Sequence, residues 1–285
     1  MSLQSALLRL TKGGPEQQAI NAGEIDAIVD YSSSNVILFS AARRALRAGA
    51  VRTSAAHRGT LANSLLAVLP SAEYRHLLVG LEPVTLRLGE VLHEPAAPIR
   101  HVYFPIGGVV CLMTTVADHK AVEVGLVGHE GMVGIALVLA DGASSVRAVV
   151  AASGAALRME ATRFHKTFMQ CLSLQQELHR YTYAMLTQAR QTIACNCFHL
   201  SDARLARWLL MTSDRAQSQE FFLTQSFLAE MLGLRRVTVT EIAGRLWRRK
   251  LISYGRGWIR ILDRPGLEAT SCQCYTKIEG NQGSR

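Results

Sequence analysis

The segment 223–261 constrains the fold of this chain more than any other part of the sequence. Thr224 is a suitable N-cap for a short helix over Gln225–Leu232, and Gly233 is a suitable helix terminator. A second helix is expected over about 236–250. A short helix, a glycine turn and a longer helix have the proportions of a helix-turn-helix.

Apolar residues in both helices recur with the spacing of a buried face. The residues expected to face inward are Phe227, Leu228 and Met231 in the first helix and Val239, Ile242 and Leu246 in the second. The polar residues of the second helix lie elsewhere on its circumference, and they are Arg236, Thr240, Glu241, Arg245 and Arg248. The pattern therefore predicts a helix with one buried face and one polar, exposed face.

The exposed residues of the second helix suit nucleic acid. Arg pairs with two acceptor atoms of guanine in the major groove, and Thr or Glu can contact other base edges or orient the Arg. The chain continues as strand, glycine turn and strand over 253–261, with Arg256 at the tip. Such a hairpin is a wing, and its Arg is placed to contact phosphate. A winged helix that serves only protein contacts is the alternative left open.

The net charge of +9 is concentrated in the same region. Residues 200–264 contain 12 Lys and Arg against 6 Asp and Glu, whereas residues 59–199 contain 10 of each class. A basic module beside a neutral one favours a polyanionic partner, because phosphate contacts dominate affinity for nucleic acid. A basic face that is merely solvated would give the same count, so charge alone does not decide between them.

Composition bounds the class of protein. The 285 residues are 49% hydrophobic and 19% charged, which excludes a disordered chain and allows two domains. The longest apolar run, 133–140, is too short to cross a bilayer, and no stretch of signal-peptide type begins the sequence. We therefore expect a cytoplasmic protein without a membrane partner. Its six cysteines are expected to be thiols or, less commonly, metal ligands.

A small antiparallel β-domain is indicated after Pro83. Short apolar or alternating segments are separated there by glycine and proline turns, as in a barrel or jelly roll. The expected strands lie at 84–88, 102–104, 109–113, 122–126 and 146–150. With the helices that follow, the predicted fold class is α+β.

A stretch without proline or glycine, 163–198, predicts a long helix. Its apolar stripe consists of Leu174, Leu178, Tyr181, Met185, Ala189 and Ile193. The stripe can pack on its own β-domain or pair with its twin in a dimer. We favour a homodimer, because a regulator that reads palindromic DNA needs two copies.

These patterns divide the chain into five parts. They are a poorly ordered extension with one small helical or hairpin element (1–58), a β-barrel (59–162), a linker and dimerisation helix (163–199), a winged helix-turn-helix (200–264) and a flexible tail (265–285).

Both the helix-turn-helix segment and the β-domain resemble those of one known family. The run LTQSFLAEMLGLRRVTVT at 223–240, closing with Leu251 and Ile252, resembles the DNA-binding signature of Crp/Fnr-type regulators. The upstream motifs resemble the family's cyclic-nucleotide-binding-like barrel, and they are GEVL at 89–92, VYFP at 102–105, GGV at 107–109, VEVG at 122–125 and EGMVG at 130–134. The resemblance covers residues 61–261 and includes both domains in the family's order. It implies a sequence-specific DNA-binding transcription regulator.

The resemblance also implies site residues. Arg235, Arg236 and Thr238 match the DNA-contacting start of the recognition helix, and Gln225 and Ser226 match the phosphate-facing start of the preceding helix. With the residues argued from chemistry, the expected DNA-binding set is Gln225, Ser226, Arg235, Arg236, Thr238, Thr240, Glu241, Arg245 and Arg256. Better-known members carry an acidic residue and an Arg where this chain has Val237 and Glu241. The family's usual operator is therefore not expected.

The residues that hold cyclic nucleotides in the family are not matched. Members that bind the ligand use a Gly-Glu pair for ribose and an Arg with Ser or Thr for the phosphate. Gly134 is followed here by Ile135 and Ala136, and the phosphate position reads Ser144-Ser145, with Arg147 out of place. A buried phosphate needs a positive charge beside it. We therefore expect no control by cyclic AMP, no cofactor and an effector of unknown identity.

Two alternatives use metal-ligating residues. The pairs Cys195/Cys197 and Cys272/Cys274 suggest a metal- or redox-sensing regulator, but their one-residue spacing is not the commonest for structural sites and the second pair lies in the expected flexible tail. The histidines of the β-domain suggest a cupin-like metal enzyme, and they are His93, His101, His119 and His129, with Glu94 nearby. None of these shares the close spacing of cupin ligands. We therefore expect no metal, no enzymatic activity, double-stranded DNA as the partner and RNA polymerase as a further candidate partner.

Overall fold

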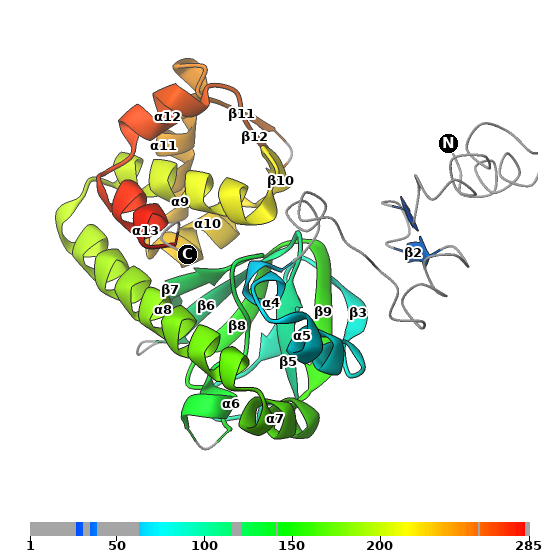
Figure 1. Cartoon of the computed structure of the whole chain (residues 1–285). Helices are drawn as coiled ribbons and strands as arrows, with labels where there is room; N and C mark the ends of the chain where they lie inside the picture. The colour runs from blue at the N-terminus through cyan, green and yellow to red at the C-terminus, as the bar shows by residue number, and fades with distance from the viewer. Residues whose placement is uncertain are drawn as a thin grey trace, which may run out of the picture. The chain divides into compact units, whose positions relative to one another are not determined.

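The computed structural model describes residues 27–30, 35–38, 63–115, 121–140, 142–255 and 257–282 (Figure 1). The chain divides into two compact units, Met1–Arg58 and Gly59–Arg285. In the first unit, β1 (Ala27–Asp30) pairs antiparallel with β2 (Asn35–Leu38). This pair agrees with the expectation of one small element in that segment. The remainder of that expectation, including poor order over 1–58, lies outside the described residues.

Two antiparallel sheets form the β-domain of the second unit. One sheet has the order β3-β9-β5 and the other β4-β8-β6-β7. The strands are β3 (Glu82–Leu86), β4 (Val91–His93), β5 (His101–Pro105), β6 (Val109–Thr115), β7 (Ala121–Val127), β8 (Arg147–Ala152) and β9 (Gly154–Glu160). The jelly-roll alternative of our prediction is confirmed, whereas the described strands form a two-sheet sandwich and do not close into a barrel.

The predicted strand set lacks β4 and β9. Strand β9 is central to its sheet, since it pairs with both β3 and β5. Its sequence, GAALRME, has little β-propensity and no clear alternation, so it gives no local signal. At its start, a Cβ on Gly154 would lie 2.3 Å from the backbone nitrogen of Gly108. The two backbone segments approach closely there because neither Gly108 nor Gly154 has a side chain.

Four short helices accompany the sandwich, and they are α4 (Ser64–Ala67), α5 (Ser71–Leu78), α6 (Ala136–Leu139) and α7 (Ala161–Gln170). Helix α8 (Leu172–Phe198) follows α7 and runs along strand β7 (Figure 1). The predicted single helix is therefore two helices, because Cys171 has an extended backbone (φ −110°, ψ 96°) between them. No proline or glycine marks this break. The buried Cys171 and Phe164 belong to the core that α7 and α8 share with the sandwich.

The expected stripe of α8 faces its own domain over its first half. Leu174, Leu178 and Tyr181 are at most 3% exposed and lie in the core of the sandwich. Ile193, at the other end of the stripe, is 64% exposed. A different set of residues is exposed along the outer side of α8 at steps of three and four, and it consists of Tyr183, Leu186, Arg190 and Ile193. We call this set the outer seam.

The C-terminal part is a helix-turn-helix with a three-stranded sheet. Helix α9 (Ser201–Ala216), which we did not predict, is followed by β10 (Glu220–Phe222), α10 (Gln225–Leu232), α11 (Arg236–Arg248), β11 (Ile252–Gly255) and β12 (Trp258–Ile261). Strand β12 pairs with β10 and β11. The predicted strand-turn-strand is thus the wing, and β10 extends it.

The predicted flexible tail is wrong for residues 265–282. Helices α12 (Arg264–Thr270) and α13 (Cys274–Gln282) form there, and Leu267, Cys274 and Ile278 are at most 2% exposed. The Asp263 side chain caps α12 by accepting from the Gly266 amide, and a proline lies in its first turn. These are ordinary helix-start signals. Because the segment is short and otherwise polar, its few apolar residues did not reveal that it packs.

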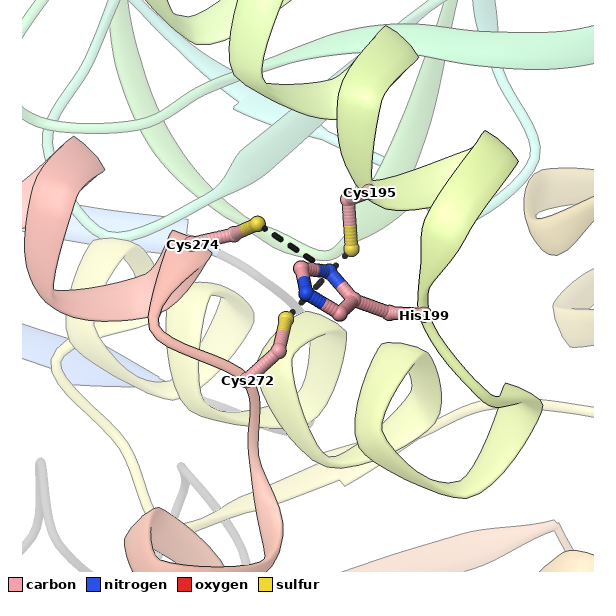
Figure 2. A group of neighbouring side chains, drawn as sticks. All are labelled: Cys195, His199, Cys272 and Cys274. Carbon is pink, nitrogen blue, oxygen red and sulfur yellow. Dashed lines mark hydrogen bonds between the residues drawn. The ribbon is translucent and has the colours of Figure 1, made fainter.

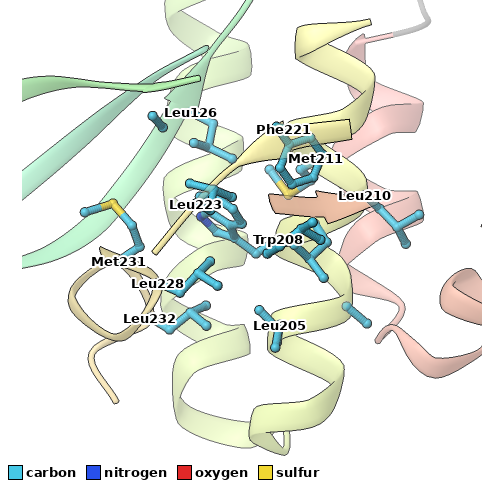
Figure 3. Close-up of a cluster of buried hydrophobic side chains, with 14 of the residues drawn as sticks. Leu126, Leu205, Trp208, Leu210, Met211, Phe221, Leu223, Leu228, Met231 and Leu232 are labelled. Carbon is cyan, nitrogen blue, oxygen red and sulfur yellow. The ribbon is translucent and has the colours of Figure 1, made fainter. Parts of the chain in front are cut away.

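One core joins the sandwich to the C-terminal part. Figure 3 shows Leu126 of β7 beside Trp208 of α9 and Leu228 of α10. Val109, Cys111 and Met113 of β6 belong to the same cluster. Helix α9 is therefore buried on several sides, and its position depends on both parts.

Candidate DNA-binding site and regulatory pocket

The helix-turn-helix begins and ends at the residues that its capping signals predict. The Thr224 hydroxyl accepts from the Phe227 amide at 3.2 Å, and Gly233 closes α10 in the left-handed conformation (φ 62°). Helix α11 then begins at Arg236, with Arg235 as its N-cap. Val239, Ile242 and Leu246 are at most 1% exposed, which confirms the predicted buried stripe. Phe227, which was also expected to face inward, is only half-buried, whereas Leu228 and Met231 are buried.

The start of α11 is an exposed polar surface. Arg235, Arg236, Thr240 and Glu241 are all exposed, and Thr238 is half-buried. Val237, which replaces the acidic residue of better-known relatives, is 68% exposed among them. The structure thus brings together, at one helix end, long guanidinium donors and shorter polar groups. This is the arrangement that end-on insertion into a major groove uses.

Thr240 links this surface to the preceding helix. Its hydroxyl donates to Gln225 Oε1 at 2.7 Å and also lies 3.0 Å from the carbonyl oxygen of Arg236. Tyr254 of the wing contacts Gln225 as well, and burial is the main cause that raises the pKa of its phenol. Gln225 is therefore positioned by both α11 and β11. Ser226, beside it, is exposed.

Arg245 is already engaged by another side chain. Its Nε and Nη2 donate to the two carboxylate oxygens of Asp202 in α9, both at 2.8 Å. The hydrogen bond with Arg245 holds the pKa of Asp202 below its usual range. The pair braces α9 against α11, so the structure gives Arg245 a bracing contact that the sequence did not suggest.

The wing carries exposed aromatic and basic groups. Trp258 is 51% exposed and packs edge-on against Phe222, with ring centroids 5.7 Å apart. Arg260 is paired with Glu220 at 2.6 Å. Arg256, the expected phosphate contact, lies outside the described residues.

Three further basic residues lie between Arg245 and Arg256 of the predicted set. Arg248, Arg249 and Lys250 are exposed at the C-terminal end of α11. The predicted set did not include them, although it contained Arg245 in the last turn of α11. The signal that could have found them is the uninterrupted basic run itself, since such runs favour phosphate contacts.

The sandwich holds a cavity of about 280 Å³ against α8. Its lining includes Gly134, Ile135 and Ala136, Ser144 and Ser145, and Gln188 of α8. No Lys or Arg is among its described lining residues. Arg147 points elsewhere and pairs with Glu94 at 3.3 Å. The Ser144 hydroxyl donates to the Val146 carbonyl at 2.6 Å, so its proton is already used.

One titratable group, His93, is found among the described lining residues of the cavity. Its Nε2 lies 2.8 Å from the His101 carbonyl oxygen, and burial is the main cause that lowers its pKa. The cavity is therefore lined mainly by uncharged and apolar groups. His101 and His129 do not join His93 in a group of metal ligands within the described part of the chain, which leaves the cupin alternative without support.

Buried polar groups connect the cavity to α9. Gln188 accepts from Arg215 Nη2 at 3.0 Å, and Arg215 Nε donates to Glu130 at 3.0 Å. Arg215 is 1% exposed. Trp208 Nε1, also on α9, donates to Glu123 Oε2 of β7. A group in the cavity that contacts Gln188 is thus linked through one side chain to Arg215 of α9, the helix that precedes the helix-turn-helix.

A two-layer antiparallel sandwich, a long helix and a helix-turn-helix with a wing define the class of regulators with a sensor domain and a DNA-binding domain. Family models agree in both parts: residues 83–171 match the cyclic nucleotide-binding domain and residues 203–270 match the Crp-like helix-turn-helix domain. The chain belongs to the Crp/Fnr family of transcription regulators, as its resemblance predicted.

Individual relatives are similar in sequence or fold. The transcriptional regulatory protein btr of Bordetella pertussis is 34% identical over 106 residues, which are 35% of this chain and 44% of that protein, so the match spans less than half of btr. FixK2 of Bradyrhizobium japonicum has a TM-score of 0.57 at 16% identity, covering 67% of this chain and 98% of that one. A CRP/FNR-family regulator from Thermus thermophilus has a TM-score of 0.54 at 23% identity, covering 67% and 98%. The two structures support the fold.

Among the described residues, no helix combines the length and the hydropathy that crossing a membrane requires, and this includes α8, the longest of them.

Proposed function

We propose that this chain is a DNA-binding transcription regulator that reads double-stranded DNA with the exposed start of α11. The observation that carries the proposal is the pair Arg235 and Arg236, exposed at a helix end whose opposite face is fully buried. Truncating these two exposed side chains would remove their contacts with DNA and would leave the core intact. This separation of roles is what a recognition helix needs.

The remaining site residues take roles according to their positions. Thr240 and Glu241, one turn into α11, face base edges, and Thr238 lies between them and the helix start. Gln225 and Ser226 at the start of α10 contact phosphate, where the free backbone amides of a helix end also favour an anion. Arg256 contacts phosphate from the wing. Arg245 would have to leave Asp202 to reach DNA, so we assign it to the edge of the interface.

Arg236→Ala tests the proposal. A duplex bound tightly by the wild-type chain is first selected from a random pool, and affinities are then measured for it and for an unrelated duplex. The variant should bind the selected duplex roughly 5- to 150-fold more weakly, as expected for one lost bidentate base contact, with little change in unfolding free energy.

A matched control is Arg180→Ala, which removes an exposed Arg of α8 that pairs only with Glu177 within the described residues. It should leave DNA affinity unchanged. Equal weakening of Arg236→Ala on both duplexes would make Arg236 a phosphate contact, and no weakening on either would remove α11 from the interface.

We further propose a homodimer formed through the outer seam of α8. Tyr183, Leu186 and Ile193 are 66%, 45% and 64% exposed at the three- and four-residue steps of a coiled coil. In light scattering, the full chain should have twice its 31.2 kDa mass. Ile193→Glu should give the monomer mass, whereas a dimeric Ile193→Glu protein would place the interface elsewhere.

The cavity is proposed to take an effector other than a cyclic nucleotide. A cyclic phosphate in this cavity would have no cationic partner among the described lining residues, and burying an unpaired anion is costly. Calorimetry of the full chain with cyclic AMP should show no binding tighter than roughly millimolar, where only weak contacts remain. Micromolar binding would contradict this.

The same assignment gives the chain no enzymatic role. Its site of action is the cytoplasm, because that is where its DNA partner lies in bacteria. RNA polymerase remains the further partner that we assign to it.

A further inference from the structure

Four metal-ligating side chains meet where α8, α9 and α13 join. They are Cys195, His199, Cys272 and Cys274, and their ligand atoms all lie within 4.8 Å of one another (Figure 2). Cys195 is in the last turn of α8 and His199 is its C-cap. Cys272 precedes α13, and Cys274 is its first residue. Two chain segments more than 70 residues apart therefore converge on one point.

The distances suit one tetrahedral ion. Cys195 Sγ lies 3.4 Å from Cys272 Sγ, and Cys274 Sγ lies 3.3 Å from His199 Nδ1. A zinc ion at about 2.3 Å from sulfur and about 2.0 Å from nitrogen would place its ligands roughly 3.5–3.8 Å apart. These two pairs therefore need adjustments of a few tenths of an ångström, and the other pairs, all within 4.8 Å, need at most about one ångström. An iron–sulfur cluster would need ligands on separate irons, spread more widely than these atoms are.

The surroundings of the four ligands also suit a metal. Gln191 Nε2 donates to Cys274 Sγ at 3.0 Å, and donors of this kind orient thiolate ligands. Three thiolates and one divalent ion leave a charge of −1. Arg204, which is 9% exposed, interacts electrostatically with Cys195 and Cys272 and would compensate that charge. Arg204 also donates to the Leu232 carbonyl at the end of α10, so the cluster adjoins the helix-turn-helix.

We propose that Cys195, His199, Cys272 and Cys274 bind a single zinc-class ion. Sulfur and imidazole ligands select zinc over magnesium, calcium and manganese, which prefer oxygen. The sequence pattern misled us in one respect: Cys197, two residues from Cys195, is exposed and outside the group, and His199 takes its place. Cys195 and His199 are four residues apart and so lie on the same side of the end of α8.

The ion would fasten α13 to the joint between α8 and α9. If the proposed function holds, α8 is the dimer helix and α9 begins the DNA-binding domain, so metal occupancy would fix the angle between them. The site itself does not depend on that function. A test of metal content therefore succeeds or fails separately from any DNA assay.

The test is elemental analysis of the full chain, purified under reduction and without a metal-affinity tag. We expect about one zinc per chain in the wild type and roughly a tenth or less in Cys272→Ser and Cys274→Ser. Cys197→Ser is the matched control and should keep about one zinc per chain. Equal loss in Cys197→Ser, or no zinc in the wild type after incubation with equimolar zinc, would overturn the proposal.

Cobalt(II) gives a second readout that does not require the variants to fold. Cobalt added to the metal-free wild-type chain should develop the intense visible absorption of a tetrahedral thiolate site, and an equivalent of zinc should abolish it. Chelation should also lower the melting temperature of the wild type, because a closed metal site stabilises the fold that contains it. An octahedral cobalt spectrum, or a Cys195–Cys272 disulfide found by mass spectrometry in protein that was purified under reduction, would overturn the proposal.

Discussion

Helix α9 makes two interfaces of different character. With α10 and α11 it shares an apolar core, in which Leu205 and Leu209 are buried with Leu228 and Ile242. The ion pair between Asp202 of α9 and Arg245 of α11 lies at the surface. Its interface with the sandwich and α8 also holds apolar residues, but two of the three buried Arg side chains of α9 lie there, whereas Arg204 faces the end of α10. The buried charged groups at this interface are Glu123, Glu130, Arg207 and Arg215, and the uncharged Gln188 lies among them.

This difference indicates which of the two interfaces of α9 can change its geometry. Apolar contacts are non-directional, so the core within the helix-turn-helix tolerates small shifts. A buried charge instead needs its partner in place, because an unpaired one costs several kcal/mol. The interface between α9 and the sandwich therefore has two states: it forms with one geometry, or the two surfaces separate completely. Gln188 lines the cavity and contacts Arg215, so an effector in the cavity would act on this interface first.

The largest effect is expected from Arg215→Ala, which removes the buried Arg that links α9 to the sandwich and to α8. Glu130, whose side chain is 10% exposed, would lose its cationic partner. Removing one member of a buried pair should lower the free energy of unfolding by about 3–5 kcal/mol. Urea unfolding of the full chain measures it.

Arg260→Ala is the matched control, because Arg260 and Glu220 form a pair with 56% and 41% of their side chains exposed. It should cost at most about 1 kcal/mol, since surface pairs are weak. If Arg215→Ala and Arg260→Ala cost the same, the buried pair does not hold α9 on the sandwich.

The contrast also separates what the sequence could reveal from what it could not. Helices α10 and α11 were predicted to within two residues, because a cap, a glycine and an apolar stripe are all local signals. Arg235 and Arg236 followed from the same signals, and the structure places both in the exposed position expected for them. Interactions between distant segments had no such signal.

Three features show this limit. Arg215 looks like any surface Arg at the end of a helix, and only folding brings Glu130 to it from 85 residues away. The metal-ligand group needed the packing of α13, which a short polar tail did not suggest. The break between α7 and α8 at Cys171 has no helix-breaking residue, so tertiary packing must determine it.

A smaller effect is expected from Glu123→Gln, which sharpens the same contrast through pH. Burial raises the pKa of Glu123, although Arg207, the hydrogen bond from Trp208 and Arg215 oppose the shift. The folded state therefore binds this proton more tightly than the unfolded state does. Its stabilising contribution is complete below the ordinary carboxyl pKa and is lost as pH rises through the raised pKa.

Gln keeps an oxygen that can accept from Trp208 Nε1 but has no charge to desolvate. Wild type and Glu123→Gln should thus be similarly stable in acid, and the variant should gain relative to wild type as pH rises. Urea unfolding at several values between about pH 4 and 8 measures the difference. If the two proteins instead change stability in parallel over that range, Glu123 is ionised in the folded state without penalty, and Arg207 and Arg215 compensate its burial completely.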